Sequence, residues 1–333
     1  MNIGIKAIEY YLPDTILTNN DLEKIFPDWS SEKIFSKTGI QSRHIASKDE
    51  CASDFAEQAV RKLFASNNIS PEDIDFILLA TQSPDYFLPT TACILQNKLG
   101  VPKSAGALDF NLGCSAFIYG LSLAKGLIHS NIAKNVLLIT ADTYSKYIHP
   151  LDKSNRTIFG DGAAAALIGF DGHCIQNFDL GTDGSGSEYL IVPSGASKLS
   201  RSDETAKEYY DEGSIRTKNN LYMNGPEIFN FTIRTVPESI KKVLEKNNMH
   251  LDDIDLFIFH QANLFILEYL RKKMNIPQNK FYINMQDIGN TVSSTIPIAL
   301  KRAEENGILK KGDKVLIVGF GVGLSWGSTI LEW

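Results

Sequence analysis

The sequence predicts an α/β protein built from two similar halves, each a mostly parallel sheet covered by helices. The main observation is an internal repeat, because NNISPEDID at 67–75 returns as NNMHLDDID at 247–255 with five of nine residues identical. In both copies an amphipathic helix precedes the repeated segment and an apolar strand follows it. The length of 333 residues is sufficient for two units that each bury a core.

The first half alternates strands and helices in chain order. Period-2 and apolar patterns predict strands, and apolar residues at helical spacing predict helices. The expected strands lie at 1–13, 76–81, 105–110, 135–141 and 164–170, and the expected helices lie at 56–66, 89–100 and from Cys114 to Ile128. Such alternation is typical of a mostly parallel sheet.

The second half follows the same order. We expect strands at 256–261, 280–285, 314–320 and 324–333, and helices at 237–246, 264–274 and from about Asn290 to 307. The polar segments 181–189 and 198–213 are expected to be loops, the second a mobile lid. We place the boundary between the halves near 171–176, so the predicted units are residues 1–172 and 173–333.

Cys114 stands where the strand ending at Phe110 gives way to a helix that is small or apolar on nearly every face. We expect Cys114 to be the first residue of this buried helix. Unpaired amide groups and the positive end of the helix dipole would then favour its thiolate, the nucleophilic form. The alternative is a buried structural thiol, since free cysteine packs well in cores.

Two further polar residues converge on the same place. The repeat puts Asn290 where the first half has Cys114, because each follows a glycine between a strand and a central helix. His260 closes the strand that matches 76–81, and open α/β folds place their sites at the carboxyl ends of strands. A histidine that merely hydrogen-bonds the backbone inside the core is the alternative.

Two glycine-rich segments, GDGAAA at 160–165 and GFGVG at 319–323, resemble nucleotide-binding loops only loosely. Each is followed by a strand-like segment instead of a helix, so neither forms a phosphate-binding loop. The second segment is better explained as a backbone that approaches a ligand closely and donates its N–H groups.

Composition excludes several classes of protein. A net charge of −6 and a pI near 5.6 argue against nucleic-acid binding. The chain start lacks the pattern of a secretory signal, and no apolar run approaches membrane-spanning length, so we expect a cytoplasmic protein without a membrane partner. Four dispersed cysteines predict neither a zinc site nor a disulfide framework.

Several motifs occur together in a characteristic order. They are KTGIQSRHI at 37–45, GCSAF around Cys114, GDGAAAA at 160–166, HQAN at 260–263, GNTVSST at 289–295 and FGVGLSWG at 320–327. The chain thereby resembles the 3-oxoacyl acyl-carrier-protein synthase III family over essentially its whole length. The resemblance implies the thiolase-like fold, a duplicated five-layer αβαβα sandwich, and a homodimer.

The resemblance also implies a reaction. Cys114 resembles the nucleophile that takes an acyl group from acyl-CoA or an acyl carrier protein. His260 and Asn290 resemble the pair that supports decarboxylation of malonyl carrier protein, after which the enolate attacks the acyl-cysteine to give a 3-oxoacyl product. The backbone N–H groups of Cys114 and Val322 match the oxyanion donors of the family. No metal or organic cofactor is expected.

Departures from the family pattern concern the donor and carrier sites. Lys33 and Lys37 stand where the family has a tryptophan and an arginine that hold coenzyme A. Trp29 lies one helical turn earlier, so the predicted donor site comprises Trp29, Lys33, Lys37 and Lys153. Phe87 and Leu88 match the position that limits the acyl pocket of the partner subunit.

The acidic carrier protein needs a local positive patch on this acidic chain, since like charges repel. The predicted patch is Arg271, Lys272 and Lys273, at the end of the helix after His260. Phe265 stands where relatives carry an arginine that contacts the carrier.

Three other functions remain open from the sequence. A thiolase-fold acyltransferase of specialised metabolism would keep Cys114 and His260 but release no carbon dioxide from a malonyl group. A non-catalytic scaffold would leave Cys114 unacylated. A papain-like peptidase shares the Cys, His, Asn order, but the duplication and the buried helix do not suit that fold.

Overall fold

The structure, a computed structural model, describes residues 2–333. The strands of the main sheet are β1 (Ile3–Tyr11), β4 (Phe76–Ala80), β5 (Gly106–Phe110), β6 (Val136–Asp142), β7 (Gly162–Phe170), β8 (His173–Thr182), β13 (Leu256–Phe259), β14 (Lys314–Gly321) and β15 (Ser325–Glu332). Short strands outside it are β2 (Ile16–Thr18), β3 (Ser42–His44), β9 (Leu190–Ile191), β10 (Tyr209–Asp211), β11 (Ser214–Arg216) and β12 (Tyr222–Met223).

The helices are α1 (Asn19–Ile25), α2 (Ser31–Thr38), α3 (Ala52–Asn67), α4 (Thr91–Leu99), α5 (Ala116–His129), α6 (Lys153–Arg156), α7 (Gly225–Lys246), α8 (Leu264–Lys273) and α9 (Thr295–Glu305). The predicted helices occur in the expected order, but α1, α2 and α6 were not predicted, and α7 begins well before the predicted residue 237. None of the helices within residues 2–333 has the length and apolar character needed to cross a membrane.

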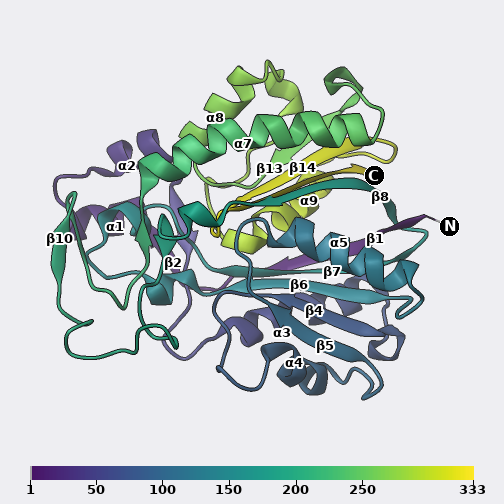
Figure 1. Cartoon of the computed structure of the whole chain (residues 1–333), viewed down its shortest axis with the longest axis horizontal. Coiled ribbons are helices and arrows are strands. Elements are labelled where there is room, and N and C mark those ends of the chain that lie inside the picture. The colour runs from purple at the N-terminus through teal and green to yellow at the C-terminus, as the bar shows by residue number, and fades with distance from the viewer. Residues whose placement is uncertain (1) are drawn as a thin grey trace.

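Helices and strands form five layers (Figure 1). Helices α5 and α9 lie in the middle, where residues such as Ile118 and Ile296 pack against strands of both halves. Helices α3 and α4 cover the outer face of the first half. Helices α7 and α8 cover the outer face of the second. The predicted α/β thiolase-like fold with an αβαβα arrangement is confirmed.

The two halves have matching topology. The strand order is β13-β14-β15-β8-β1-β7-β6-β4-β5, so each half runs outward from its first strand, β1 or β8. β4 pairs in parallel with β5 and β6, and β13 pairs in parallel with β14. At the centre, β1 and β8 pair within the described residues 2–333 through Gly4–Cys174 and Ile5–His173 alone. The division into units 1–172 and 173–333 stays a prediction.

The repeated acidic turn has the same structural role in both halves. Asn68 and Asn248 both adopt φ 52°, which ends the preceding helix in a left-handed conformation. Asp75 then accepts the backbone N–H of Asn135 at 2.8 Å, and Asp255 accepts that of Lys314 at 2.9 Å. Each aspartate therefore joins the turn to the start of the next parallel strand, which explains the similarity of the two segments.

Several predicted boundaries are wrong. The central helices start later than expected, because α5 begins at Ala116 and α9 begins at Thr295. The strand predicted at 280–285 is reduced to one bridge between Phe281 and Phe257. At this outer edge the backbone N–H of Asn284 donates to the side chain of Gln261 at 2.6 Å instead of to a neighbouring strand. The predicted loop 198–213 contains β10.

Candidate active site

One cavity of about 290 Å³ brings together the three polar residues selected from the sequence. Cys114, His260 and Asn290 all line it, although they come from three separate chain segments. Apolar side chains form most of its remaining wall, among them Phe159, Leu190, Met223, Ile228, Ile266 and Phe320. A lining of this kind suits an acyl chain or a pantetheine arm, with polar groups concentrated where chemistry would occur.

Cys114 lies in a turn two residues before α5, and only 4% of its surface is exposed. Gly321 comes so close that a Cβ added there would lie 3.2 Å from the cysteine Sγ. Burial raises the pKa of the Cys114 thiol, and the nearby Asp142 carboxylate adds to the effect. The resting thiol is therefore protonated, so the predicted thiolate at a helix terminus is wrong for the unliganded protein.

His260 directly follows β13 and is 2% exposed. Burial lowers the pKa of its imidazole to about 3, so the ring is neutral near pH 7. Its Nδ1 atom lies 2.7 Å from Oγ1 of Thr295, the first residue of α9. The predicted alternative of a histidine that only bonds backbone does not describe this contact, which is made to a side chain.

Hydrogen bonds from its backbone to the segment 158–160 hold Asn290 in place. Its N–H donates to the carbonyl of Ile158 at 3.0 Å, and its carbonyl accepts the N–H of Gly160 at 2.9 Å. Its Oδ1 accepts the Val292 N–H at 2.9 Å, which directs Nδ2 toward Nε2 of His260, 3.5 Å away. Asn290 therefore presents an amide donor beside the imidazole.

Asp142, which the sequence analysis did not select, lies buried close to this site. It accepts the N–H of Gln82 at 2.8 Å and a hydrogen bond from the Ser293 hydroxyl. Burial raises its pKa to about 7. The available signal in the sequence was a carboxylate directly after the mostly apolar strand segment VLLITA.

The turn that carries Cys114 lies next to the glycine-rich segment 319–323, and hydrogen bonds connect the two. Ser115 and Ser325 share a hydrogen bond of 2.7 Å, and Ser325 donates to the carbonyl of Val322 at 2.7 Å. A Cβ on Gly113 would lie 2.6 Å from the Val322 side chain. The two backbones approach as expected, and the oxyanion role of the Cys114 and Val322 N–H groups stays a prediction.

The open end of the cavity carries an aromatic ring surrounded by cations. Trp29 and the exposed Lys37 line the cavity directly. The ammonium groups of Lys33, Lys37 and Lys153 lie 5.6, 5.8 and 5.2 Å from the Trp29 ring centroid. The Asp28 carboxylate pairs with Lys153 at 2.6 Å, and Lys33 donates to the Asp28 backbone carbonyl at 3.0 Å. The predicted donor-site residues therefore cluster in space.

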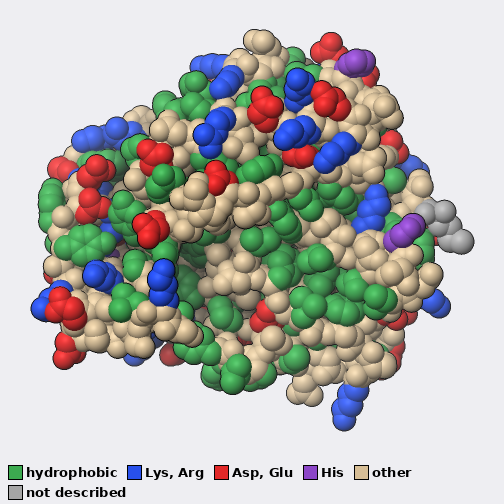
Figure 2. Space-filling view, viewed as in Figure 1, with side chains coloured by type: hydrophobic (Ala, Val, Ile, Leu, Met, Phe, Trp, Pro, Cys, Tyr) green, Lys and Arg blue, Asp and Glu red, His purple; other side chains and the backbone are tan. Residues whose placement is uncertain are grey.

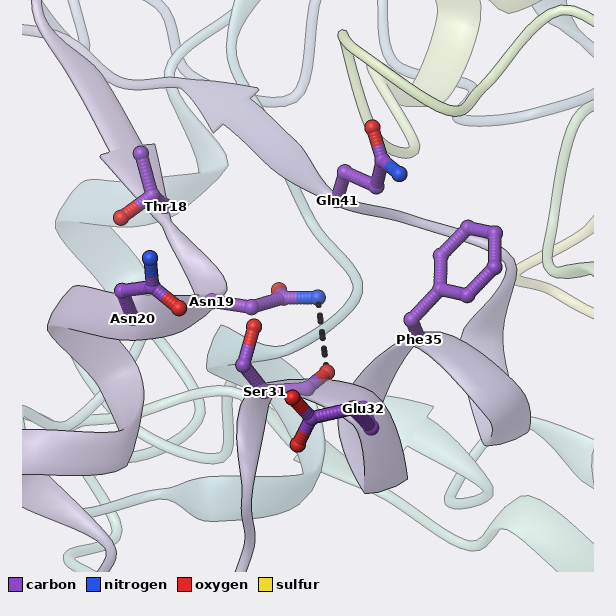
Figure 3. A pocket seen from close by; sticks show the side chains of 7 residues that line it. All are labelled: Thr18, Asn19, Asn20, Ser31, Glu32, Phe35 and Gln41. Carbon is purple, nitrogen blue, oxygen red and sulfur yellow. Dashed lines mark hydrogen bonds between the residues drawn. The ribbon is translucent and has the colours of Figure 1, made fainter.

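A separate depression of about 300 Å³ lies between α1 and α2, the helices next to Trp29 (Figure 3). It is lined by Thr18, Asn19, Asn20, Ser31, Glu32, Phe35 and Gln41. The amide of Asn19 bonds the Ser31 carbonyl at 3.4 Å and the Ile40 carbonyl at 2.7 Å. These bonds hold the two helices together, which gives the depression a structural explanation.

The predicted docking residues differ in their surroundings. Arg271 is engaged by Glu268 at 2.8 Å and by the Ile276 carbonyl, and Lys273 bonds the Ile233 carbonyl. Lys272 is exposed, although its ammonium group also lies 3.8 Å from the Glu268 carboxylate, and it lines a groove of about 700 Å³ next to Lys37. Of the three, only Lys272 lines this groove.

Phe87 and Leu88 lie outside the cavity and are 85% and 86% exposed. Within residues 2–333 we find no group of three His, Cys, Asp or Glu side chains that could hold a metal ion. The four cysteines are all free thiols.

Comparison with known proteins agrees with this geometry. Residues 108–184 match the profile of 3-oxoacyl-[acyl-carrier-protein] synthase III, and residues 244–333 match the profile of its C-terminal part. The chain is 42% identical to beta-ketoacyl-[acyl-carrier-protein] synthase III of Fusobacterium nucleatum, with 100% of this chain and 99% of the relative covered. The Caldanaerobacter subterraneus protein of the same name is 41% identical, with 99% and 97% covered.

Solved structures show the same similarity. A crystal structure of a 3-oxoacyl-(acyl-carrier-protein) synthase III superposes with a TM-score of 0.98 at 48% identity and covers all of both chains. The Thermus thermophilus enzyme superposes with a TM-score of 0.88 at 36% identity, with 99% of each chain covered. This chain therefore belongs to the 3-oxoacyl-[acyl-carrier-protein] synthase III family.

Proposed function

We propose that this protein is an acyltransferase that condenses an acyl group with malonyl carrier protein. Cys114 takes the acyl group from an acyl thioester, and decarboxylation of the malonyl group then supplies the carbon nucleophile. The products are a 3-oxoacyl carrier protein, carbon dioxide and the free thiol of the donor. The family membership favours this reaction over the alternative acyltransferase that releases no carbon dioxide.

The observation that carries the proposal is the position of Cys114, His260 and Asn290 on one buried cavity. Loss of carbon dioxide leaves a thioester enolate, whose negative oxygen needs hydrogen-bond donors in a site shielded from water. Asn290 supplies such a donor, because its Oδ1 is committed to Val292 and its Nδ2 is directed to His260. A second oxyanion forms when the enolate attacks the acyl-cysteine, and there we assign the Cys114 and Val322 N–H groups.

The cation cluster around Trp29 supports an anionic donor. Three lysines and one aspartate leave an excess of positive charge at the open end of the cavity. Phosphate groups of coenzyme A or of a phosphopantetheine arm would pair with these ammonium groups. For the carrier protein we propose a docking site that includes Lys272, because the groove it lines adjoins the cavity at Lys37.

A homodimer is the proposed assembly. β5 is the end strand of the sheet, and within residues 2–333 it pairs only with β4. Tyr86, Phe87 and Leu88 are exposed, and Figure 2 shows hydrophobic side chains gathered on the face that carries α5. An unpaired strand edge beside exposed apolar side chains is typical of an interface. The cytoplasmic location stays a prediction.

The test is carbon dioxide release from malonyl carrier protein in the presence of short acyl-CoAs, with the Cys114→Ala variant in parallel. We expect the parent protein to release carbon dioxide and form a 3-oxoacyl carrier protein, and the variant to form no condensed product. Acylation of Cys114 without carbon dioxide release would instead support an ester- or amide-forming acyltransferase. Failure of Cys114 to accept any acyl group would support a scaffold.

A further inference from the structure

The hydrogen bonds around His260 and Asn290 form a closed ring that starts and ends at one residue, Val292. The Val292 N–H donates to Oδ1 of Asn290 at 2.9 Å, and Nδ2 of Asn290 faces Nε2 of His260 at 3.5 Å. Nδ1 of His260 lies 2.7 Å from Oγ1 of Thr295, and Thr295 in turn donates to the Val292 carbonyl at 3.2 Å. All four residues are buried.

The ring has one consistent direction. The backbone N–H of Val292 can only donate, so Asn290 must accept with Oδ1 and offer Nδ2–H to the imidazole. The Val292 carbonyl can only accept, so the single hydroxyl proton of Thr295 points to it. Thr295 Oγ1 is then an acceptor toward His260, whose proton therefore sits on Nδ1. Nε2 is left with a lone pair opposite an amide N–H.

The backbone of Val292 is held in an unusual conformation that closes this ring. Its φ is 55°, in the left-handed region that β-branched residues rarely adopt. Such strain persists only where the surroundings impose it, and it concentrates at functional sites. Here the conformation lets one residue direct its N–H to Asn290 and its carbonyl to Thr295.

We infer that Thr295, together with the backbone of Val292, is a positioning residue that holds His260 as the Nδ1–H tautomer, so that Nε2 accepts the proton of Cys114. This inference rests on the proposed function and goes beyond it, since the resting histidine is an acceptor and becomes a donor only after Cys114 has been acylated.

The proton balance follows from this assignment. As the Cys114 sulfur bonds the acyl carbon, the thiol proton moves to Nε2, the bond from the acyl carbon to the donor's sulfur breaks, and the departing thiolate takes a proton from water. The imidazolium then donates Nε2–H to the enolate oxygen, beside Asn290. When the new carbon–carbon bond forms, the Cys114 thiolate departs from the acyl carbon and recovers its proton from Nε2. One proton from water is consumed in each cycle.

The neutral resting pair is consistent with burial, which raises the pKa of the Cys114 thiol and lowers the pKa of His260 to about 3. A protonated thiol requires a base before it attacks, and a neutral imidazole with a free Nε2 lone pair can serve as that base. Both residues line the same cavity.

The test compares Thr295→Val with Thr295→Ser, and it includes Thr291→Val as a matched control. The valine variant has nearly the same shape but lacks the hydroxyl, whereas the serine variant keeps it. Thr291 lies in the same segment and is buried, but its hydroxyl has no hydrogen-bond partner among residues 2–333. Its replacement therefore makes the same chemical change outside the ring.

The first readout is the ¹⁵N spectrum of histidine-labelled protein without any substrate. The chain has six histidines, and His260 is assigned by its loss in His260→Gln. We expect the parent protein, Thr295→Ser and Thr291→Val to carry the proton on Nδ1, and Thr295→Val to shift it toward Nε2. A parent histidine protonated on Nε2, or an unchanged tautomer in Thr295→Val, would overturn the inference.

The second readout is the rate of Cys114 acylation by a short acyl-CoA, followed by intact mass. We expect Thr295→Val to acylate roughly tenfold more slowly, because a misplaced proton removes most of the base, and Thr295→Ser to stay within about twofold of the parent. If Thr295→Val does not fold, the spectra of the parent protein and of Thr295→Ser still test the inference, because a proton on Nε2 of His260 in either would overturn it. Because the spectrum needs no substrate, an Nδ1–H tautomer in an inactive protein would refute the proposed function alone.

Discussion

At the residue scale, the chemistry depends on groups whose protonation is set by burial. Cys114 and His260 are both removed from water, and each is therefore neutral at rest. Asn290 does not ionise, so it can contribute only a hydrogen-bond donor in a fixed direction. The Val292 N–H sets that direction by bonding the amide oxygen of Asn290. Asp142 is a third buried group, and it carries a carboxyl whose ionisation is disfavoured by its surroundings.

Replacing Asn290 by alanine should separate the two half-reactions. The variant lacks the Nδ2 donor for the enolate oxygen, so we expect decarboxylation and condensation to fall roughly a hundredfold or more. Cys114 acylation should fall much less, because the imidazole keeps its bond to Thr295. Carbon dioxide release and the intact mass of the acylated protein report the two steps separately. Equal loss of both steps in a folded variant would make Asn290 part of the activation of Cys114.

Asp142 should make the protein less stable as pH rises. Its folded pKa of about 7 exceeds the ordinary aspartate value, so between about pH 4 and pH 7 the folded state binds more protons than the unfolded state. The contribution of Asp142 to the free energy of unfolding therefore falls as pH rises through this window. His260 has the opposite effect between about pH 3 and 6.5, since burial lowers its pKa, so a difference measurement is required.

Asp142→Asn provides that difference measurement. The amide has nearly the same shape and keeps an oxygen for the Gln82 N–H, but it does not ionise. Relative to the parent, the variant should gain stability as pH rises from about 4 to 7. Urea unfolding at several pH values gives the comparison. A constant difference between the two proteins across this range would show that Asp142 has an ordinary pKa.

At the scale of elements, the site is assembled where segments of both halves end. β13 ends just before His260, α5 begins just after Cys114, and the loop before α9 carries Asn290. Helix α8 starts at the same edge with Asn263 lining the cavity, and its last turn contributes Lys272 to the adjoining groove. An acidic partner on this groove would thus approach the open end of the cavity.

Lys272→Glu should weaken the use of malonyl carrier protein without affecting the chemistry. Exposed charges act mainly on encounter and are screened by salt, so KM should rise several-fold at low ionic strength and the difference should shrink at high salt. Acylation of Cys114 by short acyl-CoAs should stay unchanged.

The matched control is Lys311→Glu, which makes the same charge change on an exposed lysine just before β14, at the opposite end of its strand from Gly321. If both variants raise KM equally, the effect is one of net charge. If neither variant does so at low ionic strength, the carrier docks elsewhere.

At the scale of the whole molecule, duplication places the two halves of the main sheet around two central helices and, within residues 2–333, leaves β5 as one free edge of that sheet. The exposed segment of Tyr86, Phe87 and Leu88 precedes α4, which packs beside this edge. Isolated exposed apolar residues are ordinary on a protein surface, but three in succession next to an open strand are not. A second copy of the chain is the partner that the proposed homodimer requires.

Leu88→Asp should weaken the dimer, because a carboxylate would be buried at the interface without a partner. Sedimentation velocity over a range of concentrations should show the parent protein as a dimer and a variant that dissociates at higher concentration. Ile308→Asp, another exposed apolar residue located after α9, is the control and should leave the dimer intact. A monomeric parent, or unchanged dissociation of Leu88→Asp, would contradict the assembly.

Local pattern and repetition were sufficient to predict the class of fold and the three central residues. The 67–75 and 247–255 segments share a left-handed asparagine and an aspartate that caps the next strand, and these requirements are local, so they are visible in the amino acids. Because the strands of matching halves end at the same edge, the duplication also predicted that Cys114, His260 and Asn290 lie close together.

Only the tertiary structure decided how these residues behave. Cys114 is protonated because segments distant in sequence, among them those of Gly321 and Asp142, enclose its thiol. The residues adjacent to Cys114 in the sequence do not predict this desolvation. The tautomer of His260 depends on Thr295, 35 positions later, and on the backbone angle of Val292. Spacing along a chain predicts which elements form, whereas desolvation and hydrogen-bond direction depend on which atoms meet in space.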